Sequence, residues 1–181
     1  PISAGLFGYL GYDMIRQVER LPDQAAPEPL GLPEGQLLRP RVMVVFDALR
    51  QEILAAAPIR PAPGADPELL VDAARRRIEA VFARLDAPAP IASASEPWSM
   101  PEPVSNMEPA QYRQNVETAK NYIRAGDIFQ VVPSQRFSAP YSATPLSLYR
   151  SLRRTNPSPF LYFFNLPGFA IVGSSPEILV R

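Results

Sequence analysis

The sequence of 181 residues contains no cysteine and no histidine. Without cysteine it can form neither a disulfide bond nor a thiolate metal site. Without histidine it can build neither a Ser-His or Cys-His catalytic pair nor an imidazole metal site. These two absences exclude several of the commonest catalytic and metal-binding arrangements from the chain.

An excess of charge of either sign is also missing, because 18 Lys and Arg balance 18 Asp and Glu. A nucleic-acid surface would need clustered surplus Lys and Arg. The one basic run, Arg75-Arg76-Arg77, lies in a helical pattern and is interpreted as a solvated helix face. No apolar run approaches the ~20 residues that span a bilayer, and no secretory leader is recognisable. The sequence predicts a cytoplasmic protein without nucleic-acid or membrane partners.

Proline is abundant, at 23 of 181 residues, and its uneven placement divides the chain. We predict an N-terminal strand and helix region over residues 1–86, a Pro/Ala/Ser-rich connector over 87–104, and the start of a second region over 105–181. The sequence begins without methionine and stops within a strand-like run. It is therefore expected to be an internal fragment.

The first region reads as strands followed by a helix. Residues 5–13 predict a strand whose glycines allow close backbone approach, and 42–46 and 51–56 predict a hairpin. Asp66 and Pro67 fit the N-cap and first position of a helix. Its apolar stripe contains Leu70, Ala74, Ile78, Val81 and Leu85.

The second region begins with a pattern typical of a capping box, formed by Ser105 and Glu108, before a helix that Gly126 ends. The apolar stripe of that helix is Tyr112, Val116, Ala119 and Ile123. Further along the chain the pattern predicts these elements in order: a long strand over 127–137, a helix over 145–155, and strand-like runs over 160–165, 169–173 and 177–181. Because no regular βαβ alternation is present, we predict an α+β fold with mostly antiparallel pairing.

Three motifs go beyond secondary structure. Residues 125–137 read Ala-Gly-Asp-Ile-Phe-Gln-Val-Val-Pro-Ser-Gln-Arg-Phe, residues 156–161 read Asn-Pro-Ser-Pro-Phe-Leu, and residues 173–177 read Gly-Ser-Ser-Pro-Glu. In order and approximate spacing they resemble the large subunits of anthranilate synthase, within the chorismate-utilising enzymes. The resemblance covers nearly all of the chain. It implies part of an α/β sandwich with mixed, mostly antiparallel sheets and outer helices, built around chorismate.

The resemblance also implies an activity. The whole protein is expected to be a lyase that converts chorismate and ammonia, released from glutamine, to anthranilate and pyruvate. This reaction is the first step of tryptophan biosynthesis and is inhibited by tryptophan. Two alternatives stay open, namely the large subunit of aminodeoxychorismate synthase and a non-catalytic fragment that binds tryptophan or a partner.

Gln130 is the first candidate catalytic residue. Relatives that add water to the ring carry Lys at this position, because a base must deprotonate the water. Ammonia is already a nucleophile, so a neutral amide is enough to orient it. On an extended strand, Gln130 would share a face with Ile128, Val132, Ser134 and Arg136. The alternative is a strand glutamine that hydrogen-bonds to neighbouring backbone.

Glu177 is the second candidate catalytic residue. Displacement of the ring hydroxyl of chorismate requires protonation of a poor leaving group, and a carboxylic acid can supply that proton. The resemblance gives this role to the glutamate of the Ser-Pro-Glu element, which is Glu177 here. The alternative is an exposed glutamate at the beginning of a strand.

The motif at 156–161 is expected to line an effector site for tryptophan. Its prolines fix the backbone and leave carbonyl groups free, and its apolar residues can contact an indole. Phe160 and Leu161 replace the Tyr-Met pair common in the family, which removes a hydroxyl and bears on affinity. The predicted effector residues are Asn156, Pro157, Ser158, Pro159, Phe160 and Leu161.

Other parts of the family's site are not present in these 181 residues. They include an N-terminal Leu-Leu-Glu-Ser element, a catalytic histidine and the glutamates that bind Mg²⁺. We therefore expect Mg²⁺ to be a cofactor of the whole protein with no metal ligand in this chain, and we expect the chain alone to be inactive. The expected partners are chorismate, tryptophan as inhibitor, and a glutamine amidotransferase subunit in a hetero-oligomer.

Overall fold

The computed structural model describes residues 2–22, 30–89, 99 and 101–178. The chain divides into two compact units, residues 1–91 and 92–181. Much of the predicted connector lies outside the described residues. The predicted domain boundaries at residues 86 and 104 stay predictions.

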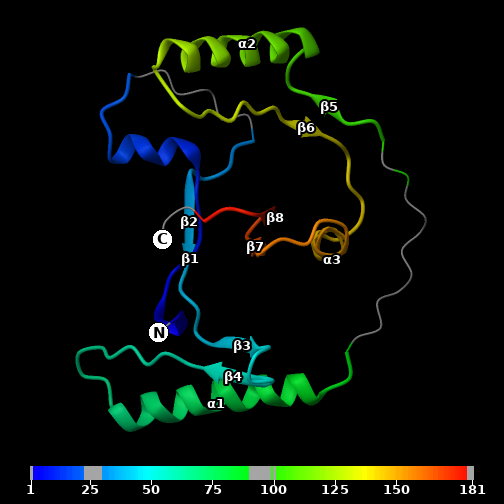
Figure 1. Ribbon diagram of the computed structural model, residues 1–181. Coiled ribbons are helices and arrows are strands. Elements are labelled where there is room, and N and C mark those ends of the chain that lie inside the picture. The colour runs from blue at the N-terminus through cyan, green and yellow to red at the C-terminus, as the bar shows by residue number, and fades with distance from the viewer. Residues whose placement is uncertain (1, 23–29, 90–98, 100, 179–181) are drawn as a thin grey trace. The chain divides into compact units, whose positions relative to one another are not determined.

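In its described residues, the first unit contains two antiparallel strand pairs and one long helix (Figure 1). In chain order its elements are η1 (Ile2–Ala4), β1 (Phe7–Leu10), η2 (Tyr12–Gln17), β2 (Gly35–Leu38), β3 (Met43–Asp47), β4 (Glu52–Ala56) and α1 (Pro67–Asp86). In the β1–β2 pair, Phe7 lies opposite Leu38. A Cβ atom on Gly8 would lie 1.8 Å from the carbonyl oxygen of Gln36, which confirms the predicted close backbone approach. The strand is shorter than predicted, because the chain turns into η2 at Tyr12.

The predicted hairpin of β3 and β4 is confirmed, with Met43 opposite Ala56 and Asp47 opposite Glu52. Its turn is stabilised by Asp47, whose carboxylate accepts hydrogen bonds from the backbone N–H groups of Leu49 and Arg50, each at 3.0 Å. Gln51 has a φ of 57°, so this non-glycine residue adopts the left-handed conformation that closes the turn. Helix α1 lies along the hairpin in Figure 1.

Helix α1 begins as predicted. The Asp66 carboxylate accepts a hydrogen bond from the Glu68 N–H at 2.8 Å, and Pro67 occupies the first turn, where its missing N–H costs nothing. Ala74, in the middle of the predicted stripe, is buried at 5% exposure, whereas Leu85 at the end of the stripe is exposed. The packed face of α1 is therefore centred on Ala74.

The second unit contains the remaining elements: β5 (Val104–Ser105), α2 (Pro109–Ala125), β6 (Phe137–Ser138), α3 (Pro145–Thr155), β7 (Phe160–Leu166) and β8 (Phe169–Ser175). Strand β5 pairs with β6, and β7 pairs with β8, both antiparallel. Helix α2 ends at Gly126 with a φ of 84°, as predicted for a left-handed cap. Mixed helices and antiparallel strand pairs confirm the predicted α+β class.

The predicted capping box is wrong. Ser105 belongs to β5, and its hydroxyl accepts a hydrogen bond from the Met107 N–H at 3.2 Å. Helix α2 begins at Pro109, and Glu108 is its N-cap without a side-chain hydrogen bond. The ring of a proline disfavours a helical conformation in the residue before it, so Glu108 stays extended and the helix begins later than the box requires.

The predicted long strand over 127–137 is also wrong, because residues 127–136 are all described and none belongs to a strand. Only Phe137–Ser138 pair, as β6. Extended backbone becomes a strand only where another strand completes its ladder, and Pro133 has no N–H to donate to one. Residues 177 and 178 are likewise not in a strand, and 179–181 of the last predicted run lie outside the described residues.

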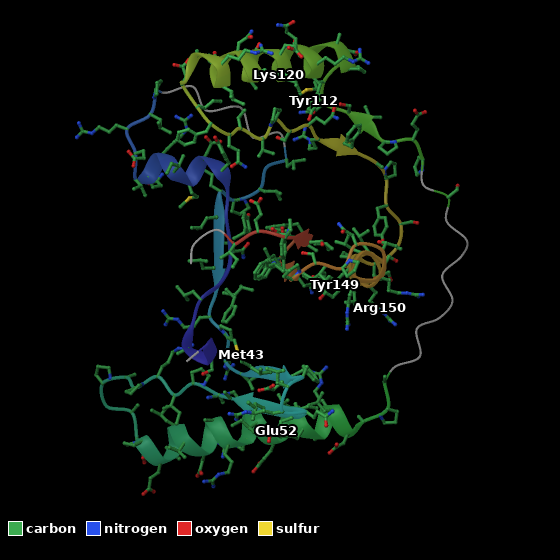
Figure 2. All side chains as sticks on the ribbon, viewed as in Figure 1. Met43, Glu52, Tyr112, Lys120, Tyr149 and Arg150 are labelled. Carbon is green, nitrogen blue, oxygen red and sulfur yellow. The ribbon has the colours of Figure 1, made fainter. Side chains whose placement is uncertain are left out.

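Helix α3 packs against the β7–β8 hairpin. Tyr149 on α3 stacks with Phe163 of β7 at a ring-centroid distance of 5.8 Å, and Figure 2 shows the position of Tyr149 beside the hairpin. Leu166, at the end of β7, is buried at 5% exposure. The turn uses Pro167 and Gly168, and the φ of 86° at Gly168 suits glycine. Among the described residues, no helix combines the length and apolar character needed to cross a bilayer.

Candidate functional site

The predicted effector motif begins where α3 ends. Asn156 is the C-cap of the helix, and its N–H donates to the Leu152 carbonyl at 2.9 Å. Pro157 cannot continue the helical hydrogen bonding, so the chain leaves the helix at this point. The motif then leads directly into β7, which begins at Phe160.

Two hydroxyl groups join this motif to the Gly-Ser-Ser-Pro-Glu motif on β8. The Ser158 hydroxyl donates to the Ser175 carbonyl oxygen. The Ser174 hydroxyl donates to the Asn156 carbonyl oxygen at 2.9 Å. The predicted effector segment and the segment that carries Glu177 therefore lie side by side, which the motifs read separately did not predict.

The register of the hairpin agrees with these contacts, since Phe160 lies opposite Ser175 and Leu161 opposite Ser174. Successive side chains of a strand point to opposite faces. Phe160 is exposed and Leu161 is half-buried. An indole that packs on one face of β7 can therefore contact only one of these two side chains directly.

Glu177 follows β8 at a turn that Ser175 stabilises. The Glu177 N–H donates to the Ser175 hydroxyl at 3.3 Å, and that hydroxyl lies 3.3 Å from the Glu177 carbonyl oxygen, to which it can donate. Pro176 between them fixes one backbone angle. The side chain of Glu177 is exposed. Its backbone is thus held two residues away from the contact between Ser158 and Ser175.

Gln130 lies in a different environment, in the segment that follows α2. The segment's neighbours Ile128 and Val131 line a pocket of about 330 Å³, but Gln130 is not part of its lining. The other lining residues are Asn115, Thr118, Ala119, Tyr122, Pro133 and Ser134. Gln130 is exposed, and no hydrogen bond among the described residues joins it to Glu177.

The residues predicted to share a strand face with Gln130 do not lie together on one face in the structure. A strand would have placed Gln130 together with Ile128, Val132, Ser134 and Arg136, whereas Ile128 and Ser134 line the pocket and Val132 is 78% exposed. The end of the segment is fixed at β5, where the Arg136 N–H donates to the Asn106 side-chain oxygen at 2.9 Å. The two candidate catalytic residues therefore stay predictions, Glu177 beside the effector motif and Gln130 apart from it in the hydrogen-bond network.

The whole chain, residues 1–181, matches the family described as chorismate binding enzyme. The chain belongs to this family. The result agrees with the resemblance of the three motifs, two of which the β7–β8 hairpin brings into contact.

Similar proteins point to one branch of the chorismate-binding enzymes. A protein from Cereibacter sphaeroides named anthranilate synthase component 1 is 50% identical over 182 residues, which cover 100% of this chain and 36% of the relative. A Streptomyces coelicolor protein with the same name is 40% identical over 190 residues, again with 100% and 36% covered. The chain thus spans about a third of the length of the curated relatives it matches.

A solved structure agrees with the sequence comparisons. The crystal structure of anthranilate synthase component I from Streptococcus pneumoniae matches with a TM-score of 0.76 and 34% sequence identity. The match covers 98% of this chain and 39% of the other chain. The predicted membership of the anthranilate synthase fold is therefore confirmed.

Sequence reasoning missed the serine contacts between the two motifs, although a signal for them exists. Pro167-Gly168 is a strong turn pair between two apolar runs. Counting outward from this turn pairs Leu166 with Phe169 and, six residues further, Phe160 with Ser175. The register alone would have placed the two motifs next to each other.

Proposed function

We propose that this chain forms part of the large component of an anthranilate synthase, which converts chorismate and ammonia to anthranilate, pyruvate and water. The observation that carries the proposal is 50% and 40% identity, across the whole chain, to proteins named anthranilate synthase component 1. Gln130 at the position where water-adding relatives carry Lys also supports amination. A neutral amide can orient ammonia but cannot deprotonate water.

In the proposed first step, ammonia forms a C–N bond to the ring while the C–O bond of the ring hydroxyl breaks. The carboxylic acid of Glu177 donates its proton to the departing hydroxyl, which leaves as water. Gln130 directs the lone pair of ammonia toward the ring. The loss of pyruvate that follows requires groups from the rest of the protein.

Tryptophan binding at residues 156–161 would inhibit this step through the two serine contacts. A ligand that moves Asn156 or Ser158 changes the hydrogen bonds to Ser174 and Ser175, and Ser175 in turn holds the backbone of Glu177. Coupling of this kind requires that the ligand bind one arrangement of the contacts better than the other. Tryptophan and chorismate would therefore each favour one arrangement of the contacts around the β7–β8 hairpin.

The remaining parts of the proposal concern the whole protein. They are a glutamine amidotransferase subunit that supplies ammonia, a hetero-oligomer, a cytoplasmic location and Mg²⁺ as cofactor. The residues described here do not fit a metal site, because no group of three or more His, Cys, Asp or Glu side chains among them could hold an ion. No step assigned to this chain runs through the metal.

The decisive experiment is product identification with the full-length protein, chorismate, Mg²⁺ and ammonium, with and without tryptophan. We expect fluorescent anthranilate and pyruvate in equal amounts, and we expect tryptophan to suppress both. Accumulation of aminodeoxychorismate would favour the alternative enzyme. Accumulation of isochorismate would contradict the role given to Gln130.

A variant tests Gln130 directly. Gln130→Ala should lower kcat/KM for ammonia by about 10- to 100-fold, because the nucleophile loses its orienting group. Gln114→Ala is the matched control, since Gln114 is also exposed and lies on α2 in the same unit. An equal and small effect of both substitutions would remove Gln130 from the mechanism.

A further inference from the structure

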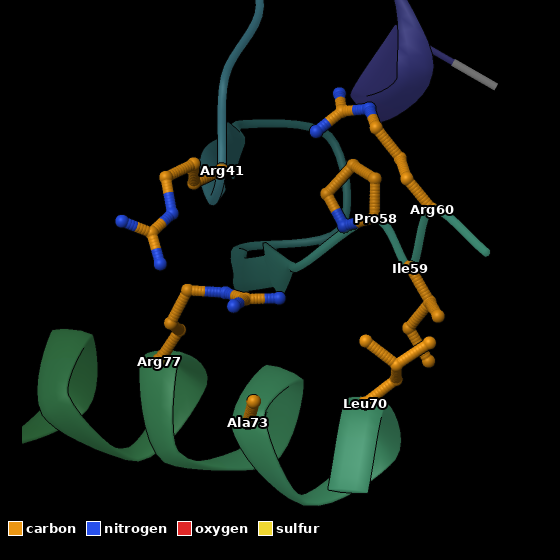
Figure 3. A pocket seen from close by; sticks show the side chains of 7 residues that line it. All are labelled: Arg41, Pro58, Ile59, Arg60, Leu70, Ala73 and Arg77. Carbon is orange, nitrogen blue, oxygen red and sulfur yellow. The ribbon is translucent and has the colours of Figure 1, made fainter. Parts of the chain in front are cut away.

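A pocket of about 170 Å³ lies in the first unit, between helix α1 and the chain that flanks the β3–β4 hairpin (Figure 3). Three arginines line it, namely Arg41, Arg60 and Arg77. The rest of its wall is apolar and consists of Pro58, Ile59, Leu70 and Ala73. No acidic residue belongs to the lining.

Two of the arginines extend into the opening from opposite sides. Figure 3 shows the Arg77 side chain rising from α1 toward the hairpin and the Arg41 side chain extending toward the helix. The Nε atom of Arg77 is buried and has no hydrogen-bond partner among the residues that the structure describes. Because a buried N–H without a partner has lost its hydration without compensation, this group favours an acceptor from outside the described residues.

Arg60 has a different role in the pocket. Its Nη2 atom donates to the Pro40 carbonyl oxygen at 3.1 Å, and in Figure 3 its guanidinium points away from α1. This bond fixes the backbone next to Arg41. Arg60 therefore positions the wall of the pocket, and the free donors belong to Arg41 and Arg77.

The charges of Arg41 and Arg77 are not balanced within the described residues. The ion pairs found there are Asp13–Arg16, Asp72–Arg75 and Glu117–Lys120. Arg75 and Arg76 fit the solvated helix face that the sequence predicts, since Arg75 pairs with Asp72 and Arg76 is exposed. Arg77 differs from both, because it is half-buried and faces the pocket.

We propose that this pocket is a binding site for a small organic oxyanion, a carboxylate or phosphate attached to an apolar body. Guanidinium groups present forked donors that match the oxygen atoms of such groups. An anion between Arg41 and Arg77 supplies the acceptor that Arg77 Nε lacks and offsets positive charge that the two guanidinium groups carry. The apolar wall of Ile59, Leu70 and Ala73 accommodates the hydrocarbon part of the ligand.

Calorimetric titration of the full-length protein tests the site, with inorganic phosphate as a probe of charge alone and benzoate as a probe of charge with an apolar ring. We expect both to bind the wild type, and benzoate to bind more tightly. Arg77→Ala and Arg41→Ala should each weaken binding by at least about tenfold, which corresponds to one lost charged hydrogen bond. Arg76→Ala, on the same helix but outside the pocket, should change affinity by less than about twofold.

The fold of each variant is checked by circular dichroism and thermal unfolding. Arg41 is exposed, so Arg41→Ala decides the question even if Arg77→Ala fails to fold. Absence of binding to the wild type, or equal weakening by Arg76→Ala, would overturn the proposal. If no added anion binds and Arg77→Ala lowers thermal stability, a carboxylate of the protein itself fills the pocket, and the proposal also fails. None of these outcomes bears on anthranilate formation, because no residue of the pocket belongs to the proposed mechanism.

Discussion

Two segments of the chain carry the candidate catalytic residues, and different contacts hold each segment in place. The segment before Glu177 is one strand of a hairpin whose partner lies directly across a two-residue turn. The segment around Gln130 has no strand partner among the described residues, and Phe129 beside Gln130 is 98% exposed. A partner that is close in sequence costs little loop-closure entropy, so local sequence is enough to form the first segment.

The hairpin also contains a close contact between side chain and backbone across its two strands. The ring of Tyr162 lies over Gly173, so closely that a Cβ atom on Gly173 would lie 2.1 Å from Cζ of Tyr162. Glycine at this strand position thus leaves room for a cross-strand aromatic ring. We expect substitutions in the hairpin to have larger effects on stability than substitutions in the segment around Gln130.

The largest effect is expected on catalysis, from a substitution of Glu177, which follows strand β8 of the hairpin. Glu177→Gln keeps the shape of the side chain but removes the acid, and should lower kcat by about 10²- to 10⁴-fold. Anthranilate fluorescence from the full-length protein measures it, and Glu102→Gln, at an exposed position of the same unit, is the control. Near-normal turnover of Glu177→Gln would mean that the acid lies elsewhere.

The second effect concerns the packing of the hairpin. Gly173→Val should destabilise the protein by about 2 kcal/mol, because the added carbons overlap the Tyr162 ring. Thermal unfolding of the full-length protein measures it. Combination with Tyr162→Ala should recover part of the loss, since the two positions are in contact and their effects do not add. Additive losses would show that the ring does not cause the destabilisation.

The third effect tests the contact between the two motifs. Ser158→Ala removes the hydrogen bond to the Ser175 carbonyl and should cost about 1 kcal/mol of stability. If this contact transmits the effector signal, the tryptophan concentration for half-inhibition should also rise by several-fold. Ser151→Ala on α3 is the control, because its exposed side chain makes no such contact. Unchanged inhibition in Ser158→Ala would separate the contact from regulation.

The smallest effect on stability is expected from a substitution on the exposed face of α2. The Lys120 ammonium donates a hydrogen bond to Glu117 at 2.7 Å, and this bond and the charge of Lys120 lower the pKa of the Glu117 carboxyl group. A lowered pKa in the folded state stabilises the fold above the ordinary carboxyl pKa, and this contribution disappears as the pH falls through the lowered value. Lys120→Ala should return the pKa toward its ordinary value in an NMR titration.

The stability of Lys120→Ala should be unchanged, because both side chains of the pair are more than half exposed and water screens their charges. A clear loss of thermal stability would show that the pair is less exposed in the full-length protein than in this chain.

Local signals predicted most of the regular elements. The N-cap at Asp66, the left-handed cap at Gly126 and the β3–β4 hairpin were all recognisable, because the residues that decide them are neighbours in sequence. The errors occurred where two local signals compete or where a partner is needed. At Ser105 the capping pattern was overridden by Pro109, and over residues 127–136 the β-branched pattern had no strand to pair with.

The candidate site, too, could be predicted only in part from the sequence. The identities of Gln130, Glu177 and residues 156–161 came from motifs in the sequence. Their contacts did not come from the motifs read separately. They follow from the register of the hairpin, which brings together residues 17 and 18 positions apart, namely Ser158 with Ser175 and Ser174 with Asn156. The three-arginine run gives another example, since helical spacing places Arg77, but not Arg76, beside the apolar stripe of Leu70 and Ala74, while the pocket that Arg77 lines is not visible in the sequence.

By itself, then, the sequence determined where helices and turns begin and end, and it determined the family through three short motifs. Both depend on residues that are adjacent in the chain, whose backbone preferences act before any packing. The tertiary structure alone decided that Gln130 stands outside the contact between the other two motifs, and that Arg77 faces a pocket without an acidic partner among the described residues. These outcomes depend on how a loop segment and a helix pack against other elements, which only contacts between distant residues fix.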